Sequence, residues 1–170
     1  LSIRRQRQMC IRDRDMGQQC YEVPVGFKYI SAKMAETNAV IGGESSGGLA
    51  VRGHIAGKDG IYAAALLVEM LAVTGKSVSE LFAEITAQYG NPCWAEADFR
   101  MTPERKAELQ KLLFTEKRVP EFGTAVDHIS LEDGCKVYFK DGSWVICRFS
   151  GTEPLLRMAA EAETDEKAQS

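Results

Sequence analysis

Residues 148–157, near the end of the chain, combine residue types that bind oxyanions. They read RFSGTEPLLR, so Arg148 and Arg157 bracket a turn that contains Ser150, Gly151 and Thr152. Arginine stays charged, and its planar fork matches two phosphate oxygens at once. Hydroxyl groups and exposed backbone N–H groups in a tight turn supply further donors, and the proline stiffens the turn. The alternative is a hairpin with two surface arginines, but the pattern favours an anion site.

A second candidate is the glycine-rich segment 42–48, which reads GGESSGG. Glycine lets a ligand approach the main chain closely. Glu44 lies between glycines and can accept two hydrogen bonds from neighbouring hydroxyl groups, as on a sugar. The alternative, which composition alone favours, is a strand-to-helix connection with a solvated Glu44. A Walker-type phosphate loop is excluded because no G-K-[ST] follows.

Strands must hold the arginine-flanked turn. Strand-like runs occupy residues 125–131, 135–140, 143–149 and 155–163. Asp-Gly pairs, which are strong hairpin signals, separate the first three runs. Arg148 and Arg157 therefore lie just before and just after a turn between strands, where both can face the same mouth. Thr102-Pro103 opens a charged helix ahead of these strands, and Thr164 is expected to cap a helix that the chain end cuts off.

Helices surround the glycine-rich segment. The spacing of apolar residues predicts a helix over residues 26–38 and another over 59–74. A brief strand is expected at residues 39–41. Ser77 and Glu80 form a capping-box pattern that opens a helix ending near Gly90. Residues 91–101 are expected to connect two domains, an α/β piece and a small α+β unit with an antiparallel sheet.

Composition excludes several function classes. The chain has 170 residues, 45% of them hydrophobic, and a net charge of -3, which gives no reason to expect nucleic acid or a membrane as partner. Five cysteines without a C-x-x-C pair favour reduced thiols and a cytoplasmic location. Residues 1–14 carry five arginines. This stretch is either a basic arm of an interaction protein or a translated sequencing-adapter scar, and we favour the scar.

Four motifs occur in order: VPVGFKYI, GGESSGG, GHIAGKDGIYAA and RFSGTEPLLR. They resemble successive motifs in the C-terminal half of the α-D-phosphohexomutases, the phosphoglucomutase/phosphomannomutase family. The resemblance covers residues 21–164 and implies three related α/β domains followed by a smaller α+β domain. It divides the chain into a non-native or disordered leader (1–20), the end of the third α/β domain (21–96) and the C-terminal phosphate-binding domain (97–170). Both ends look truncated.

The resemblance also implies residue roles. Glu44 and Ser46 match the family's sugar-binding loop. Lys28 matches a lysine near the reacting centre, while His54 and Lys58 match polar positions that line the cleft. The phosphate-binding loop corresponds to Arg148, Ser150, Gly151, Thr152 and Arg157. Gly48 stands where the phosphoglucosamine mutase branch usually has histidine, which favours phosphoglucomutase first and phosphomannomutase next.

The implied activity is the interconversion of hexose 1-phosphate and hexose 6-phosphate through a phosphoserine and a bisphosphorylated sugar. The family's serine motif and its Mg²⁺ loop have no match here, and the chain's aspartates Asp127, Asp133 and Asp141 are scattered. Mg²⁺ ligands are therefore expected in the parent enzyme rather than in this chain, and the chain alone is expected to be inactive. The alternative function is a non-catalytic module that binds a phosphorylated hexose.

Overall fold

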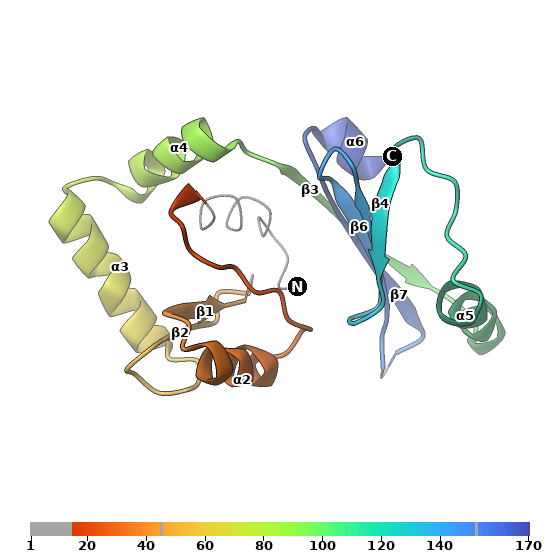
Figure 1. Cartoon of the computed structure of the whole chain (residues 1–170), viewed down its shortest axis with the longest axis horizontal. Coiled ribbons are helices and arrows are strands. Elements are labelled where there is room, and N and C mark those ends of the chain that lie inside the picture. Colours follow the sequence, from red (N-terminus) through yellow and green to blue (C-terminus); the bar gives the residue numbers. More distant parts are fainter. Residues whose placement is uncertain (1–14, 45, 152) are drawn as a thin grey trace. The chain divides into compact units, whose positions relative to one another are not determined.

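The computed structural model describes residues 15–44, 46–151 and 153–170. The chain forms two compact units, Leu1–Asn91 and Pro92–Ser170, whose elements are labelled in Figure 1. The division lies five residues before the boundary inferred from the sequence. Residues 1–14 of the expected leader lie outside the described residues. From its remainder, Asp15 accepts a hydrogen bond from the Tyr89 hydroxyl at 3.2 Å.

A small hairpin and the helix before it position the glycine-rich loop in the first unit. The helix is α2 (Phe27–Thr37), and the hairpin consists of β1 (Ile41–Gly43) and β2 (Leu49–Val51). Helix α2 packs on β1 so closely that a Cβ at Gly42 would come within 2.5 Å of Ile30 Cγ2. Glycine is therefore required for packing at this position as well as for any ligand approach.

The expected helix over residues 26–38 is confirmed, whereas the strand expected at 39–41 begins two residues later. Asn38 adopts a left-handed conformation with φ of 55°, and the N–H of Ala39 still bonds to Met34 O. Residues 39 and 40 therefore form part of the link between α2 and β1. The ladder instead runs through the glycines, with Gly42 opposite Ala50.

Two capped helices complete the described part of the first unit, α3 (Gly60–Thr74) and α4 (Val78–Tyr89). Asp59 caps α3, and Ser77 with Glu80 forms the predicted capping box at the start of α4. No helix among the described residues is by itself long and apolar enough to span a membrane. Helices α3 and α4 reach that length and composition only together, across a bend of 81°.

The second unit is built on an antiparallel sheet with the strand order β3-β7-β6-β5-β4 (Figure 1). Its strands are β3 (Cys93–Arg100), β4 (Val126–Ser130), β5 (Cys135–Phe139), β6 (Trp144–Phe149) and β7 (Leu155–Ala162). Its helices are α5 (Pro103–Gln110), the π-helical turn η1 (Lys111–Thr115) and α6 (Asp165–Gln169). The four predicted strands and the caps at Thr102 and Thr164 are confirmed, as is the fold class, a mixed helix and strand chain with an antiparallel sheet.

The prediction that residues 91–101 form a connection is wrong, because most of them form the edge strand β3. This strand pairs with β7 from Cys93 opposite Ala162 to Arg100 opposite Leu155. Its sequence does alternate, with polar residues at 96, 98 and 100 between apolar ones. The Gly-Asn-Pro run just before it concealed this pattern, since such a run also marks linkers.

Trp144 and Ile146 are buried on one face of the sheet, and a second hydrophobic cluster lies on the other face. Leu113 of η1 packs there against Cys135 and Val137 of β5, with Cys147 and Phe149 of β6 beside them. Strand residues alternate between faces. Arg148, which lies between two of these core residues, therefore projects from the opposite face.

Candidate functional site

The glycine-rich loop is a tight turn that buries one carboxylate. Glu44 N donates to Gly48 O at 2.8 Å, and Gly47 N donates to Glu44 O at 3.0 Å. These bonds close the end of the β1-β2 hairpin, and the Glu44 side chain is only 9% exposed. A buried charge requires partners, so the contacts of this carboxylate define what the loop can bind.

Two side chains among the described residues contact Glu44 Oε2. Lys58 Nζ lies 2.6 Å from it, and Ser46 Oγ donates to it at 3.3 Å. The structure thus brings Glu44, Ser46 and Lys58 together. The arrangement presents a fixed carboxylate, an ammonium and a hydroxyl, which are groups that hydrogen-bond sugar hydroxyls.

Gly48 makes this arrangement possible. A Cβ at this position would lie 2.9 Å from Lys58 Cδ and 3.2 Å from Glu44 Oε2. Lys58 therefore crosses the space that a side chain at position 48 would fill. A residue larger than glycine would have to push Lys58 away from Glu44.

His54 is held by the start of α3. Its Nε2 lies 2.8 Å from Asp59 Oδ2, and its ring stacks on Tyr62 with centroids 4.0 Å apart. The pKa of Asp59 is lowered from its usual 3.8, chiefly because the carboxylate accepts the Tyr62 backbone N–H, and next because it contacts His54. The Asp59 carboxylate therefore stays ionised at neutral pH.

Among the described residues, no contact joins Lys28 to Glu44, Lys58 or His54. Its ammonium lies 4.8 Å from the centre of the Tyr29 ring, one position along α2. It is exposed to solvent.

The arginine-flanked turn joins β6 to β7 in the second unit. In the register of these strands Arg148 is directly opposite Arg157, and Ser150 N donates to Leu155 O at 2.9 Å. Directly opposed residues share one face of an antiparallel pair, so both arginines project from the face away from the Leu113 cluster. Like charges in this position repel unless anions balance them.

Carboxylates balance the charges of the two arginines. Arg148 Nε lies 3.3 Å from Asp133 Oδ1, and Arg157 lies 3.7 Å from Glu153. The second pair is more than half exposed on both sides. Exposed pairs of this kind contribute at most about 1 kcal/mol, so a phosphate could displace Glu153 at little cost.

The turn itself is braced from two directions. Ser150 Oγ accepts the N–H of Glu153 at 3.1 Å, and Lys106 Nζ of α5 donates to Ser150 O at 2.8 Å. Gly151 is exposed, and Thr152 lies outside the described residues.

Sequence reasoning missed Asp59, Lys106 and Asp133, which hold the predicted residues in place. A signal existed for Asp59, because an aspartate before an apolar helical run is a typical N-cap. Lys106 lies one turn after the Thr102 cap, but only the folded chain shows that this turn faces Ser150. Asp133 was recognised only as a turn residue.

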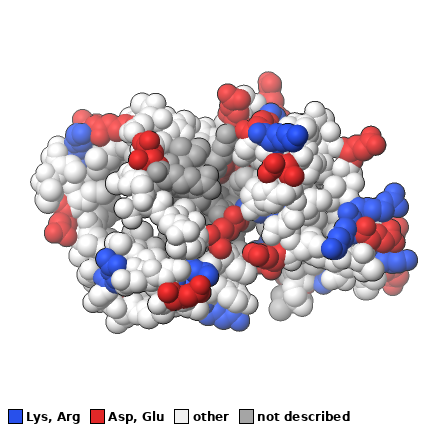
Figure 2. Space-filling view, in the orientation of Figure 1, with Lys and Arg blue, Asp and Glu red and all other residues white. Residues whose placement is uncertain are grey.

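Charge on the surface is mixed. Figure 2 shows basic and acidic side chains interspersed on the visible face. An anion site would thus depend on the local placement of the two arginines rather than on a broad basic field. Among residues 15–44, 46–151 and 153–170, no group of three His, Cys, Asp or Glu side chains could hold a metal ion. The described residues therefore do not fit Mg²⁺.

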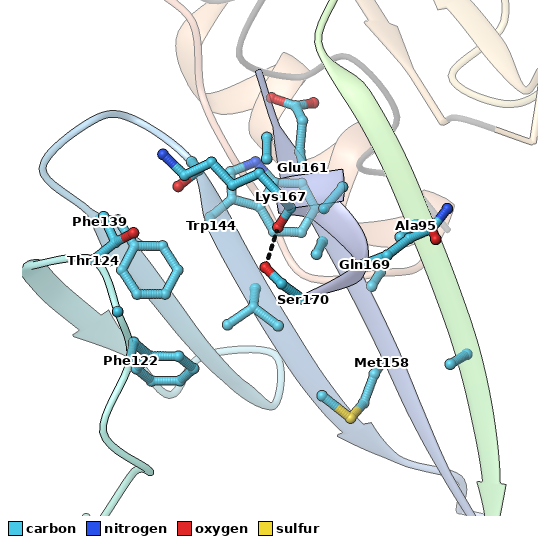
Figure 3. A pocket seen from close by; sticks show the side chains of 18 of the residues that line it. Ala95, Phe122, Thr124, Phe139, Trp144, Met158, Glu161, Lys167, Gln169 and Ser170 are labelled. Carbon is cyan, nitrogen blue, oxygen red and sulfur yellow. Dashed lines mark hydrogen bonds between the residues drawn. The ribbon is translucent and has the colours of Figure 1, made fainter. Parts of the chain in front are cut away.

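A cavity of about 670 Å³ lies elsewhere in the second unit (Figure 3). It lies beside α6, on the face of the sheet that carries the Leu113 cluster, and its lining includes Phe122, Phe139, Met158 and Ser170. None of the predicted phosphate-binding residues that the structure describes contributes to it. The cavity is thus separate from the arginine-flanked turn.

Comparison with known proteins was made against family profiles, curated proteins and solved structures. The profile described as "Phosphoglucomutase/phosphomannomutase, alpha/beta/alpha domain III" matches residues 11–89. The profile described as "Phosphoglucomutase/phosphomannomutase, C-terminal domain" matches residues 98–170. The chain belongs to the phosphoglucomutase/phosphomannomutase family. The resemblance inferred from the four ordered motifs is thereby confirmed.

Members of this family with similar sequences carry different names. A protein of Thermococcus kodakarensis named phosphoglucomutase/phosphomannomutase is 34% identical, with 90% of this chain and 31% of that protein covered. A probable phosphoglucosamine mutase of Methanopyrus kandleri is 36% identical, with 92% and 32% covered. The chain thus spans about a third of the length of the curated relatives it matches.

Solved structures of the family share the fold. A phosphoglucomutase/phosphomannomutase family protein from Burkholderia thailandensis superposes with a TM-score of 0.70 at 25% identity, covering 96% of this chain and 32% of that chain. A putative phosphomannomutase from Thermus thermophilus gives a TM-score of 0.68 at 27% identity, covering 99% and 32%.

Proposed function

We propose that the whole enzyme containing this chain moves a phosphate between the 1- and 6-positions of a hexose, through a phosphoserine and a bisphosphorylated sugar. The observation that carries the proposal is the pair Arg148 and Arg157, directly opposed on one face at a braced turn. Such a pair needs an anion between or beside its guanidinium groups. A phosphate supplies that anion and can be gripped two oxygens at a time.

The reaction explains why a rigid anion site and a sugar-reading loop belong together. A bisphosphorylated intermediate must turn around, so one site must hold the non-reacting phosphate in both orientations. Arg148, Arg157 and Ser150 serve that role, while Glu44 and Ser46 read the sugar hydroxyls. Lys28 and His54 act near the reacting centre in this proposal.

The proposed sugar is glucose, with mannose next. The relatives' names include glucosamine as well as glucose and mannose, so the choice rests on the loop. Gly48 leaves room for Lys58 to reach Glu44 at 2.6 Å. A histidine there, as in the glucosamine branch, would have to displace Lys58.

Mg²⁺ belongs to the proposal only for the whole enzyme, where it would neutralise charge on the transferring phosphate. No group of His, Cys, Asp or Glu side chains among the described residues could hold it. For the chain by itself we propose binding of a phosphorylated hexose without turnover. Both ligand-reading loops lie within the chain, which supports this second role.

Titration of the full 170-residue chain tests the proposal. Inorganic phosphate and glucose 6-phosphate, added separately and followed by NMR, should shift resonances of the arginine-flanked turn. Arg157→Gln should weaken phosphate binding roughly tenfold, because a charge-assisted contact at an exposed site is lost. Arg118→Gln is the matched control, since Arg118 is 74% exposed and pairs with Glu116 instead.

Glu44→Gln separates the sugar loop from the phosphate turn. It should weaken binding of glucose 6-phosphate and leave binding of inorganic phosphate unchanged. Equal effects of Arg157→Gln and Arg118→Gln would overturn the phosphate site. Equal losses for both ligands in Glu44→Gln would assign the loop a structural role.

A further inference from the structure

The imidazole of His54 is held from two sides by α3. Asp59 Oδ2 contacts its Nε2 at 2.8 Å, and the Tyr62 ring lies against its face at an interplanar angle of 17°. The Asp59 carboxylate sets the rotation of the imidazole within its own plane. The stacked Tyr62 ring sets the orientation of that plane. The His54 side chain remains 32% exposed, so part of the ring is open to solvent.

Asp59 is itself fixed by its second oxygen. Oδ1 accepts the backbone N–H groups of Ile61 and Tyr62, each at 3.0 Å, and so caps α3. One oxygen is therefore committed to the helix and the other to His54. A carboxylate held in this way accepts from the ring nitrogen that carries a proton, which selects one tautomer of a neutral histidine.

We propose that Asp59 is a positioning residue that keeps the proton of neutral His54 on Nε2 and leaves Nδ1 as the nitrogen that meets the substrate. The role of His54 rests on the proposed function, in which Nδ1 accepts a proton or hydrogen bond from a sugar hydroxyl. Asp59 does not touch the substrate in this arrangement.

The same stretch of chain links His54 to the sugar loop. Lys58 immediately precedes Asp59 and bonds to Glu44. Two consecutive residues at the start of α3 thus hold the sugar-reading carboxylate and the histidine. A change in the cap of α3 would move both together, so a test must keep the cap.

The second histidine of the chain provides an internal control. His128 also pairs with an aspartate and stacks on a tyrosine, but it uses the other nitrogen: its Nδ1 lies 2.7 Å from Asp127 Oδ2. It is also more exposed, at 59%. His54 and His128 should therefore show opposite tautomers in one spectrum.

Long-range ¹H–¹⁵N spectra of the full chain, labelled at histidine, test the proposal directly. The spectra are recorded at about pH 8.5, roughly two units above the ordinary histidine pKa. His54 should carry its proton on Nε2. In Asp59→Asn the amide oxygen keeps the cap, since asparagine caps as well as aspartate, and the amide N–H₂ replaces Oδ2. The donor should drive the His54 proton to Nδ1.

Asp127→Asn is the matched variant, and it should change His128 alone. An unchanged His54 tautomer in Asp59→Asn, with the helical circular dichroism intact, would overturn the proposal. Should Asp59→Asn fail to fold, Asp59→Ser keeps a capping hydroxyl and removes Oδ2. It should give a mixture of His54 tautomers, and a pure Nε2–H form would overturn the proposal.

Glucose 6-phosphate then separates this inference from the proposed function. Binding should shift the Nδ1 resonance of His54 more than its Nε2 resonance. Shifts at Arg157 without any at His54 would overturn the role of His54 and leave the phosphate site standing. No shift at either residue would sink the proposed function, whereas the tautomer measurement would still decide whether Asp59 positions the ring.

Discussion

The two units of the chain hold their candidate sites on very different supports. In the second unit, strands and helices enclose buried apolar side chains such as Leu113, Val137 and Ile146, and the arginine-flanked turn projects from this sheet. In the described part of the first unit, the buried apolar residues are Ile30 and Ala50. Neither α3 nor α4 has a buried residue.

The contrast is sharpest in α3, which is apolar along most of its length. Ile61 is 86% exposed and Val73 is 80% exposed. Caps and backbone bonds alone give only marginal helices of this length. The arginine-flanked turn is therefore supported by a core within its own unit, whereas in the described part of the first unit the sugar loop and His54 are held mainly by local hydrogen bonds and ion pairs.

Native-state hydrogen exchange should show the largest difference between the two units. Amides of β5 and β6 should be protected on the order of a hundredfold more than those of α3, about 3 kcal/mol in local opening free energy. The reason is that opening the sheet exposes the core, while opening α3 exposes little that is not already exposed. Equal protection in the two units would show that the comparison is wrong.

Truncation of one valine in each unit should show the same difference at single residues. Val137 is 3% exposed in β5 and Val73 is 80% exposed in α3. Val137→Ala should lower the free energy of unfolding by about 2 kcal/mol because it leaves a cavity. Val73→Ala should change it by less than about 0.5 kcal/mol, since alanine also favours helix. Urea denaturation measures both values, and comparable losses would place Val73 in a core of its own.

The same contrast explains what the sequence could predict. Strands 125–131, 135–140, 143–149 and 155–163 were predicted within about two residues because apolar alternation and Asp-Gly turns agree there. The start of β1 and the whole of β2 were not predicted, because three-residue strands rich in glycine carry almost no periodicity. Edge strand β3 was misread because the Gly-Asn-Pro run outweighed its alternation.

The residues of the candidate site also differ in how far the sequence could predict them. Arg148, Arg157 and Glu44 could be proposed from residue type and motif, and they keep their roles as predictions. The residues that hold them could not, because Lys106 lies 44 positions from Ser150 and Asp133 lies in a different turn. Contacts between distant segments follow from the fold, and no local pattern encodes them.

The smallest expected effect is a loss of folding stability at acid pH, and it also differs between the two units. In the second unit Asp141 joins separate elements: it accepts the Ser143 N–H in the β5-β6 turn and pairs with Lys167 of α6. The Lys167 contact, and then the bonds from Ser143, lower the pKa of Asp141 from 3.8 to about 2. In the first unit Asp59 also has a lowered pKa, but its contacts lie within five residues of it.

A carboxyl group whose pKa is lower in the folded state stabilises the fold above its unfolded pKa, and this contribution is lost as pH falls through the folded value. The second unit should therefore lose stability between about pH 4 and pH 2. Because Asp141 is 32% exposed, solvent screening reduces the effect to on the order of 1 kcal/mol.

Asp141→Asn should flatten the acid limb of the unfolding free energy, measured by tryptophan fluorescence across urea titrations. Asp127→Asn, at a 56% exposed aspartate, is the control and should leave the limb unchanged. An acid limb equally steep in Asp141→Asn would mean that α6 is not tied to the sheet through this pair.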